Sequence, residues 1–377
     1  DGGAGTYFPF SSVDGTLFNA SSYANRDLTV NFGQWQYFDA TDLSETSAAK
    51  GFFRFTPPDG FKACNNDNLK DIDSYQTALN ITKNRDATDN WMVFDRVRGP
   101  YLDWHTNSIN QQATNYNTLQ RFLKHGQEVG EDNEVNRDKD KFTSFNWYME
   151  TTGSGTANEV GGINTTRTLV DSTGGISTGI FEGTGSASTI GHGIGAVPLN
   201  STDDAADDAG MWNDTAPTST VFSVGTGSSV NKSGDTMAYY AFANIEGYSK
   251  FGHYEGNGST SKAGPLIYTG FRPKLVIIKN TQANSTYWMV MSRDRADASP
   301  QTPAGIDIQN PLQNYLQMNA TNADTGGYDT IDMLSTGFRV VNTTAWTSLN
   351  TSCKRYIYMA WAEHPFGGES TTPVPAS

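Results

Sequence analysis

Three short sequence patterns recur along this chain of 377 residues, and this repetition constrains its fold more than any other feature. The first pattern, G-x-[FY]-E-G-x-G-S, occurs at residues 179–186 and again at residues 252–259. In each copy a strand-forming aromatic residue precedes a glycine-rich segment, which is typical of a strand that ends in a tight turn. A chain with such copies is expected to be built from one repeated supersecondary unit.

The second pattern, L-x-I-x-K-N, occurs at residues 79–84 and 275–280. Its alternation of apolar residues predicts a strand with one buried face. A polar segment follows in both copies, and then the string W-M-V appears at residues 91–93 and 288–290. The pattern therefore predicts a hairpin whose two strands share an apolar face.

The third pattern is an apolar and aromatic strand that closes each unit, at residues 145–150, 239–244 and 358–363. Both of its faces are apolar, as expected for a strand inside a sandwich. The last two copies are preceded by N-[KT]-S at residues 231–233 and 350–352. The first unit has no glycine-rich turn and the second has no hairpin, so the copies are degenerate.

These patterns predict an all-β protein of tandem antiparallel β-sandwich units. At most one short helix is expected, because Leu119, Phe122 and Leu123 recur at helical spacing between residues 117 and 129. Residues 151–176 are rich in Gly, Ser and Thr, which predicts a linker. The expected boundaries are a first repeat at 74–150, the linker at 151–176, a second repeat at 177–250, a third at 251–368 and a flexible tail at 369–377.

Charge and apolar patterning exclude two classes of partner. The chain has 40 acidic and 26 basic residues and a net charge of -14, which repels phosphate backbones and argues against nucleic-acid binding. No apolar run is long enough to span a membrane. The two cysteines, Cys64 and Cys353, either pair or remain free, and they are too few for a structural zinc site.

Several of these segments resemble a known family. The strings N-F-G-Q at residues 31–34 and F-x-F-T-P-P-D-G-F-K-A at residues 53–63 resemble the end of a SPRY-like sandwich from phage tail proteins. The following part resembles repeats of phage tail fibres and related virion appendages. The matching strings are G-F-x-P-x-L-V-x-I-K-N at residues 270–280, a closing Y-x-x-x-A-x-A-E-x-P-F-G at residues 356–367 and a junction at residues 246–252.

This resemblance implies concanavalin-like, or lectin-like, sandwich repeats preceded at residues 1–73 by the C-terminal part of a SPRY-like sandwich, so that the chain begins inside that domain. It implies a non-enzymatic structural protein of a bacteriophage virion, extracellular in its tail or appendage. The expected role is host-surface recognition or building of the fibre shaft. The expected partners are further copies of the chain, as a trimer in a tail fibre, other virion proteins and host-surface glycans. The family provides no catalytic residues to carry over.

Candidate ligand-binding residues follow from the loops. Trp104, Trp212 and Trp346 lie in polar contexts, where exposed indole rings stack on sugars, so they are the candidate sugar-binding residues. The acidic cluster is the candidate Ca²⁺ site, since lectin-like sandwiches hold Ca²⁺ in acidic loops, and no other cofactor is expected. This cluster consists of Asp203, Asp204, Asp207 and Asp208.

Two other functions remain open at this point. An extracellular filament or surface-layer subunit would assemble through the edges of its β-sandwiches. A carbohydrate-active enzyme on the same fold would need two carboxylates facing each other across a groove. Glu182 and Glu255, which recur in the first pattern, are the candidates for that pair, although a structural role beside the turn, binding backbone amides or a neighbouring arginine, fits them better.

Overall fold

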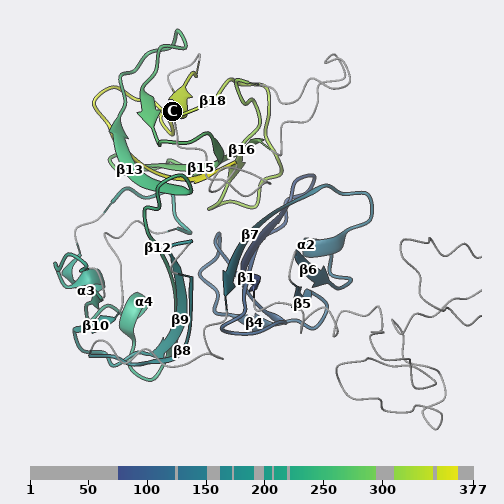
Figure 1. Ribbon diagram of the computed structural model, residues 1–377, viewed down its shortest axis with the longest axis vertical. Coiled ribbons are helices and arrows are strands. Elements are labelled where there is room, and N and C mark those ends of the chain that lie inside the picture. Colours follow the sequence, from purple (N-terminus) through teal and green to yellow (C-terminus); the bar gives the residue numbers. More distant parts are fainter. Residues whose placement is uncertain are drawn as a thin grey trace, which may run out of the picture. The chain divides into compact units, whose positions relative to one another are not determined.

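The computed structural model describes residues 75–123, 126–150, 162–171, 174–190, 199–205, 208–218, 221–293, 310–342 and 346–363 (Figure 1). Contacts divide the chain into residues 1–72 and residues 73–377, and all described residues belong to the second part. The expected SPRY-like segment at 1–73 and the expected tail at 369–377 lie outside the described residues.

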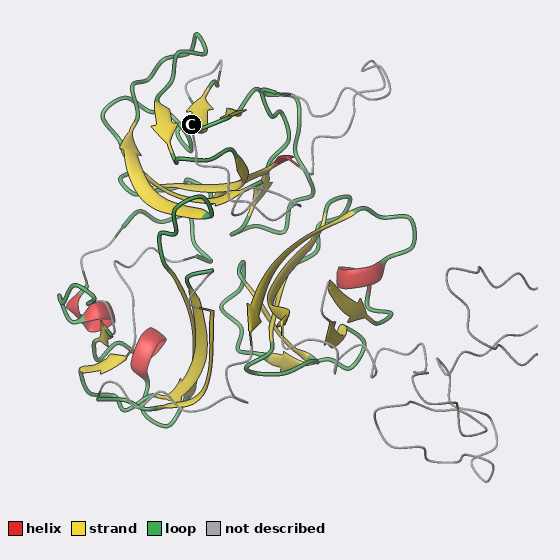
Figure 2. Cartoon of the chain, viewed as in Figure 1, coloured by secondary structure: helices red, strands yellow, loops and turns green. Residues whose placement is uncertain are grey.

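Antiparallel strands dominate the described chain, as Figure 2 shows, and the all-β class is confirmed. The described helices are each a single turn of four residues, namely α2 (Asn133–Asn136), α3 (Ala209–Trp212) and α4 (Ser228–Asn231). The strands form three lobes. Each lobe has a larger sheet and a smaller one that packs on it, which is the expected tandem β-sandwich architecture.

The first lobe has a five-stranded sheet in the order β4-β3-β2-β1-β7. A hairpin of β5 and β6 packs on this sheet against Met92 and Phe94 of β2. The strands are β1 (Tyr75–Asn84), β2 (Trp91–Asp95), β3 (Leu102–His105), β4 (Ala113–Thr114), β5 (Leu119–Leu123), β6 (Gly126–Val129) and β7 (Phe142–Glu150).

Strands β5 and β6, at residues 119–123 and 126–129, lie within the segment 117–129, where the apolar spacing predicts a helix. A β-bulge between Leu119 and Arg121 shifts the alternation of side chains by one position. Leu119 and Phe122 therefore both enter the core although they are three residues apart. The helix prediction is wrong because a bulged strand and a helical turn leave the same i, i+3 pattern of apolar residues.

The second lobe has a three-stranded sheet in the order β12-β9-β8 and a smaller sheet of β10 and β11. Phe181 of the larger sheet packs against Phe222 and Val224 of the smaller one. The strands are β8 (Thr165–Asp171), β9 (Ile176–Glu182), β10 (Ser188–Ile190), β11 (Phe222–Val224) and β12 (Thr236–Phe242).

Strand β8 lies inside residues 151–176, where the composition predicts a linker, so the linker prediction is wrong for this segment. Leu169 is buried and packs into the core of the molecule. Two other inward residues, Thr165 and Thr168, hydrogen-bond to each other through their hydroxyls at 2.6 Å. This pairing removes the cost of burying hydroxyl groups, which is how a polar sequence forms a buried strand.

The third lobe has a five-stranded sheet in the order β13-β20-β15-β16-β17, packed on a smaller sheet in the order β14-β19-β18. Val276 and Ile278 of β15 meet Phe338 and Val340 of β19 in the core between these sheets. The strands are β13 (Ser249–Glu255), β14 (Leu266–Tyr268), β15 (Pro273–Asn280), β16 (Met289–Ser292), β17 (Leu316–Gln317), β18 (Ile331–Leu334), β19 (Gly337–Val340) and β20 (Arg355–Ala362).

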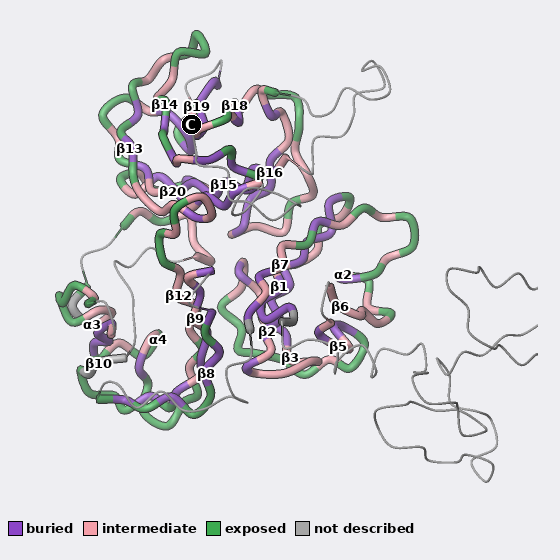
Figure 3. The backbone as a smooth tube through the Cα atoms, viewed as in Figure 1, coloured by how far each residue is buried: buried purple, intermediate pink, exposed green. Residues whose placement is uncertain are grey.

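The second faces of the three large sheets meet in one core that all lobes share. Figure 3 shows the long buried stretches of β2 and β15 that contribute to it. Polar groups also join the first and third lobes: Trp91 Nε1 donates to Gln317 O at 2.9 Å, and Arg85 forms a 2.8 Å ion pair with Asp324. The lobes are therefore parts of one folding unit rather than independent domains.

Three aromatic rings, one from each closing strand, contact each other in this shared core. The ring centroids of Trp147 and Phe242 are 5.7 Å apart, those of Trp147 and Trp361 are 5.3 Å apart, and those of Phe242 and Trp361 are 5.5 Å apart. All three contacts are edge-to-face, an arrangement that aromatic quadrupoles favour. We call these three residues the aromatic triangle.

The aromatic triangle corrects the alignment of the first closing strand by one residue. Trp147 pairs with Leu79 of the first L-x-I-x-K-N strand, and Trp361 pairs with Leu275 of the second. Trp147 therefore corresponds to Trp361, whereas aligning residues 145–150 with 358–363 matches it to Ala360. The difference matters because a slip of one residue moves every side chain to the opposite face of the sheet.

Candidate functional site

The tryptophan expected to bind sugar in the first lobe is half-buried against the shared core. The Trp104 ring stacks on Tyr240 with centroids 6.2 Å apart and planes at 17°. Its Nε1 donates to Tyr240 Oη at 3.1 Å, and that hydroxyl donates to the buried Asp95 carboxylate at 2.6 Å. Burial and the Asp95 charge raise the pKa of Tyr240, which keeps the phenol protonated. This chain of bonds joins the first and second lobes.

The other two candidate tryptophans are partly buried at the edges of lobe cores. Trp212 packs edge-on against Phe222 in the second lobe, with centroids 6.1 Å apart. Trp346 packs edge-on against Tyr315 in the third lobe, at 4.7 Å. The structure therefore does not bring the three candidates together into one site.

The described aspartates of the acidic cluster contact different parts of the chain. Asp203 and Asp204 lie beside the loop that follows β15, where Asp204 N donates to Asn284 Oδ1 at 3.1 Å. Asp208 accepts a bond from Gly210 N at 2.8 Å at the start of α3. Asp207 lies outside the described residues. Within the described ranges no group of three or more possible ligands is arranged to hold a metal ion.

The repeated carboxylates Glu182 and Glu255 are both exposed and stand at the ends of equivalent strands, β9 and β13. Glu182 pairs in register with Thr236, and Glu255 pairs with Arg355. Each belongs to a different lobe. Their recurrence follows from the repeated strand and turn rather than from a pair built into one groove.

The repeated lysines Lys83 and Lys279 occupy equivalent positions and are fully buried. Lys83 Nζ donates to the carbonyls of Asn84 and Ala87 at 2.6 and 3.0 Å, and Lys279 Nζ donates to Thr286 O at 2.7 Å. Burial lowers the pKa of each lysine to about 8, although nearby carboxylates oppose the shift. Each ammonium group thus holds the loop of its hairpin closed, a structural role that the alternating pattern alone did not reveal.

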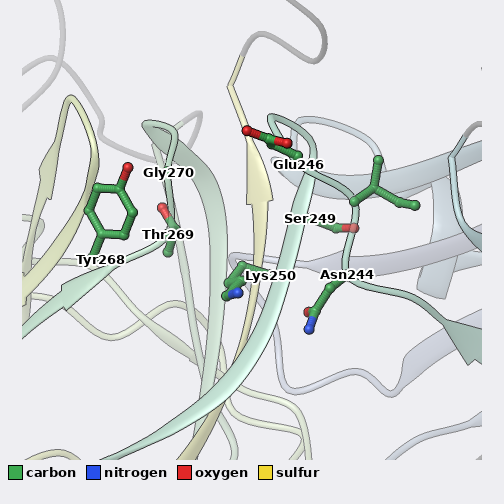
Figure 4. Close-up of a pocket in the computed structure, with 8 residues that line it drawn as sticks. Asn244, Glu246, Ser249, Lys250, Tyr268, Thr269 and Gly270 are labelled. Atoms are coloured by element: carbon green, nitrogen blue, oxygen red, sulfur yellow. The ribbon is translucent and has the colours of Figure 1, made fainter. Parts of the chain in front are cut away.

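An open pocket of about 390 Å³ lies in the third lobe and is the candidate functional site. Figure 4 shows Tyr268, Thr269 and Gly270 on one side and Asn244, Glu246 and Ser249 on the other, with Lys250 between them. The second group comes from the segment that joins the second and third lobes. The sequence identified this segment only as a junction between units.

A tight turn positions the junction side of the pocket. Ile245 N donates to Ser249 O at 3.0 Å and Ser249 N donates to Ile245 O at 2.9 Å, so the backbone reverses within five residues. Gly247 has φ of +73° at the apex, a conformation that a side chain would strain. This turn projects Glu246 outward at the rim and leads directly into Lys250 on β13.

The hydrogen bonds of the pocket divide its polar groups into structural and available ones. The Ser249 hydroxyl donates to Ala243 O at 2.8 Å, and the Thr269 hydroxyl donates to Phe271 O at 2.6 Å. The Asn244 carbonyl oxygen accepts from Phe251 N at 2.7 Å, which leaves its amide N–H groups available. Glu246 and Lys250 have no hydrogen-bond or ion-pair partner among the described residues.

The available groups are a cation, a carboxylate, an amide donor and an aromatic ring. The ring belongs to Tyr268, which is 67% exposed although it lies in a strand. Such a set can hold a hydroxyl-rich ligand by hydrogen bonds while the ring covers its apolar face. Sequence analysis missed the site because β14 is only three residues long and its polar partners come from a distant turn.

The fold thus defines the class of this protein: tandem antiparallel β-sandwich lobes built around one shared core. No described helix is both long and apolar enough to cross a bilayer. The chain belongs to the family described as a domain of unknown function (DUF7483), whose model matches it at residues 67–199 and again at residues 196–365. The two matches meet inside the second lobe. No curated protein and no solved structure matches the chain.

Proposed function

We propose that this chain is a non-enzymatic structural protein of a bacteriophage virion, extracellular in a tail fibre or similar appendage. The strings at residues 270–280 and 356–367, which resemble repeats of such appendages, support this role. The shared core supports it as well. A body whose lobes are fixed to each other can present surface loops in constant positions.

Recognition of a host-surface glycan at the pocket is the specific activity that we propose. The observation that carries it is the exposed Tyr268 ring beside the unpartnered Lys250 and Glu246 side chains. Burying an exposed ring against a sugar removes apolar surface from water, and the charged groups select the hydroxyl and charge pattern. The proposed activity is binding without a step of turnover.

The proposal also includes assembly with other chains. The partners are further copies of this chain, as a trimer in a tail fibre, and other virion proteins. The inner faces of the three lobes are already used in the shared core. Contacts between chains would therefore involve the outer surfaces of the lobes. Several copies on one particle would raise the avidity for a repeated surface glycan by orders of magnitude without any new contact.

The location is tested by electron microscopy of native phage particles labelled with gold-conjugated antibodies against this chain. Label at the tail or its appendages is the expected result. Label on free filaments, or no label on any particle, would contradict the virion role whatever the chain binds.

The glycan role is tested by binding of the purified full chain to immobilised bacterial surface polysaccharides. Tyr268→Ala and Lys250→Ala are each expected to reduce binding at least tenfold, because they remove the ring and the cation of the pocket. Leu266→Ala is the matched control, since Leu266 is exposed on the same strand but does not line the pocket. Equal binding by all variants would exclude the pocket as the binding site.

A filament or surface-layer subunit is the second candidate, and the edge of the third lobe favours it. Strand β14 is the last strand of its sheet among the described residues, and Leu266 and Tyr268 are 60% and 67% exposed on it. An exposed apolar edge can add a strand from a neighbouring chain. Filaments of the purified chain that disappear in Leu266→Lys would favour this role over the first.

A further inference from the structure

We propose that the first lobe contains a second binding site, for an uncharged polysaccharide, formed by Tyr101 and residues 109–117. We call this region the tyrosine–amide surface. Residues 109–117 belong to the segment between β3 and β5, which includes the short edge strand β4, and Tyr101 directly precedes β3. The tyrosine–amide surface shares no residue with the pocket of the third lobe, so the two sites can be tested separately.

The segment around this surface contains no ionisable side chain other than the Tyr116 phenol. Residues 106–120 lack Asp, Glu, Lys, Arg and His, although 18% of the chain is Asp, Glu, Lys or Arg. At that frequency a segment of fifteen residues would contain about three such charges. In their place the segment has four asparagines and three glutamines. An exposed loop of an acidic protein is thus neutral and rich in amides.

Two apolar side chains of this segment are more exposed than any other large apolar residues described. Ile109 is 89% exposed and Tyr116 is 70% exposed. The rings of Tyr101 and Tyr116 contact each other with centroids 5.3 Å apart and planes at 54°. The exposed Tyr116 ring, held against the half-buried Tyr101 ring, presents a ready-made apolar surface, and such patches mark interaction sites when polar groups surround them.

The backbone fixes Tyr101 in a strained conformation. Its φ is +67°, which is rare for an aromatic residue. Tyr101 N donates to Leu119 O at 3.1 Å, and Tyr101 O accepts from Asn115 N at 2.8 Å. Strain of this kind persists where the surroundings impose it and is common at binding sites. The backbone therefore fixes the direction in which the Tyr101 side chain leaves the chain before any ligand arrives.

Several amides of this segment are available to a ligand. The side chains of Asn110, Gln111 and Asn117 have no hydrogen-bond partner among the described residues. Gln112 uses only its carbonyl oxygen, which accepts from Arg98 Nη1 at 3.1 Å and leaves its N–H groups available. An amide has donors and an acceptor side by side, which matches the adjacent hydroxyls of a sugar ring.

Charge decides between neutral and anionic glycans. The surface has no unpaired cation to bind a uronate or phosphate, because the nearby Arg98 is held by Asp95 and Gln112. The net charge of -14 repels polyanions as they approach. An uncharged polysaccharide needs no cation and is not repelled by the net charge. It can stack on the tyrosines and form hydrogen bonds with the amides.

The test is affinity electrophoresis of the full chain in gels that contain dextran, mannan or a neutral galactan. Retardation by at least one of these polymers is expected, nearly unchanged between low and high salt, since no ion pair contributes. Tyr116→Ala and the double variant Gln111→Ala/Asn117→Ala are each expected to raise the dissociation constant at least tenfold. Val170→Ala, an exposed apolar change in the second lobe, is the control that leaves retardation unchanged.

Three results would overturn the proposal. The first is absence of retardation by all the neutral polymers. The second is retardation that survives both variants, and Tyr268→Ala then shows whether the pocket of the third lobe is responsible. The third is salt-sensitive binding of alginate, or binding of a protein partner, that Tyr116→Ala abolishes while neutral polymers are ignored. None of these results bears on the virion role, which the labelling experiment tests by itself.

Discussion

The second and third lobes are built from the same strand, turn and closing strand, yet of their described residues only those of the third form an L-x-I-x-K-N hairpin. In both lobes the glycine-rich turn encloses a buried asparagine. Asn231 Oδ1 accepts from Thr184 N at 2.8 Å, and Asn350 Oδ1 accepts from Asn257 N at 2.9 Å. The third lobe then inserts β15 and β16, with Lys279 closing their loop, whereas the described part of the second lobe has no such pair.

The first lobe differs in the opposite way, because its described part keeps the hairpin and lacks the strand that precedes the glycine-rich turn in the other two lobes. It has the hairpin of β1 and β2, but in the part of the chain that the structure describes β7 is the last strand of its sheet, and no strand corresponds to β9 or β13. All three lobes retain a closing strand with an inward aromatic residue. All three also retain a helical turn that ends in asparagine, at Asn136, Asn231 and Asn350. The shared core takes one inward aromatic residue from the closing strand of each lobe, and β1, β2, β8, β9, β15 and β16 add further apolar side chains to it.

The largest expected effect is the loss of one ring from the aromatic triangle. Trp361→Ala is expected to reduce the free energy of unfolding by about 3–5 kcal/mol, because it leaves a cavity where three lobes meet. Phe242→Ala should have a similar effect although the second lobe is the smallest. Denaturant unfolding followed by fluorescence and by circular dichroism measures both variants, and one shared transition is expected. Separate transitions would show that the lobes are independent.

A pH effect should distinguish the lobes that contain a hairpin from the one that does not. The pKa of Lys83 and of Lys279 is about 8 in the folded chain, against 10.5 for an ordinary lysine. The unfolded chain therefore binds more protons between these values, and stability rises with pH across this window. The rise between pH 7.5 and pH 9.5 is expected to be about 2 kcal/mol for each lysine.

Lys279→Met is the variant that measures this rise. Denaturant unfolding at several fixed pH values should show that the free energy of unfolding increases less with pH for the variant than for the native chain. Asp203 and Asp204, the carboxylates that act on Lys279, remain in place and serve as the constant background. An identical slope in both proteins would mean that the lysine is hydrated in solution.

The glycine turns allow a matched comparison between the second and third lobes. A Cβ atom at Gly256 would collide with Thr351 O, and one at Gly183 would collide with Lys232 O. Both obstacles are backbone atoms that cannot rotate away, so each change to alanine is expected to cost about 1–3 kcal/mol. Thermal unfolding measures the cost. A neutral Gly183→Ala would show that the turn of the second lobe is loosely packed.

The smallest effect concerns the asparagine that ends the helical turn. Asn231 and Asn350 are buried and bond the glycine turn, so alanine at either position is expected to cost about 1–2 kcal/mol. Asn136 is exposed and donates only to Gly130 O, so Asn136→Ala should cost less than about 0.5 kcal/mol. An equal loss of stability at all three positions would show that the bonds to the glycine-rich turn are not the reason why Asn231 and Asn350 stabilise the fold.

Part of the candidate site could be predicted from the sequence. The string at residues 246–252 identifies this segment as a junction between units, but nothing in the string indicates that the segment forms one wall of a pocket. Tyr268 gave no signal, because a strand of three residues has too few positions to show alternation. Trp104 gave a misleading signal: its polar neighbours indicated a loop, while the ring itself packs against Tyr240 from another lobe.

The sequence by itself determined the all-β class, the hairpins at L-x-I-x-K-N and the glycine-rich turns, because these depend on side-chain alternation and backbone freedom within a few residues. Only the tertiary structure decided what the closing strands do. Contacts between residues as distant as Trp147 and Trp361 leave no trace in local patterns, and their register depends on which strand pairs with which. The repeats thus specified three similar units, and long-range packing joined them into one core.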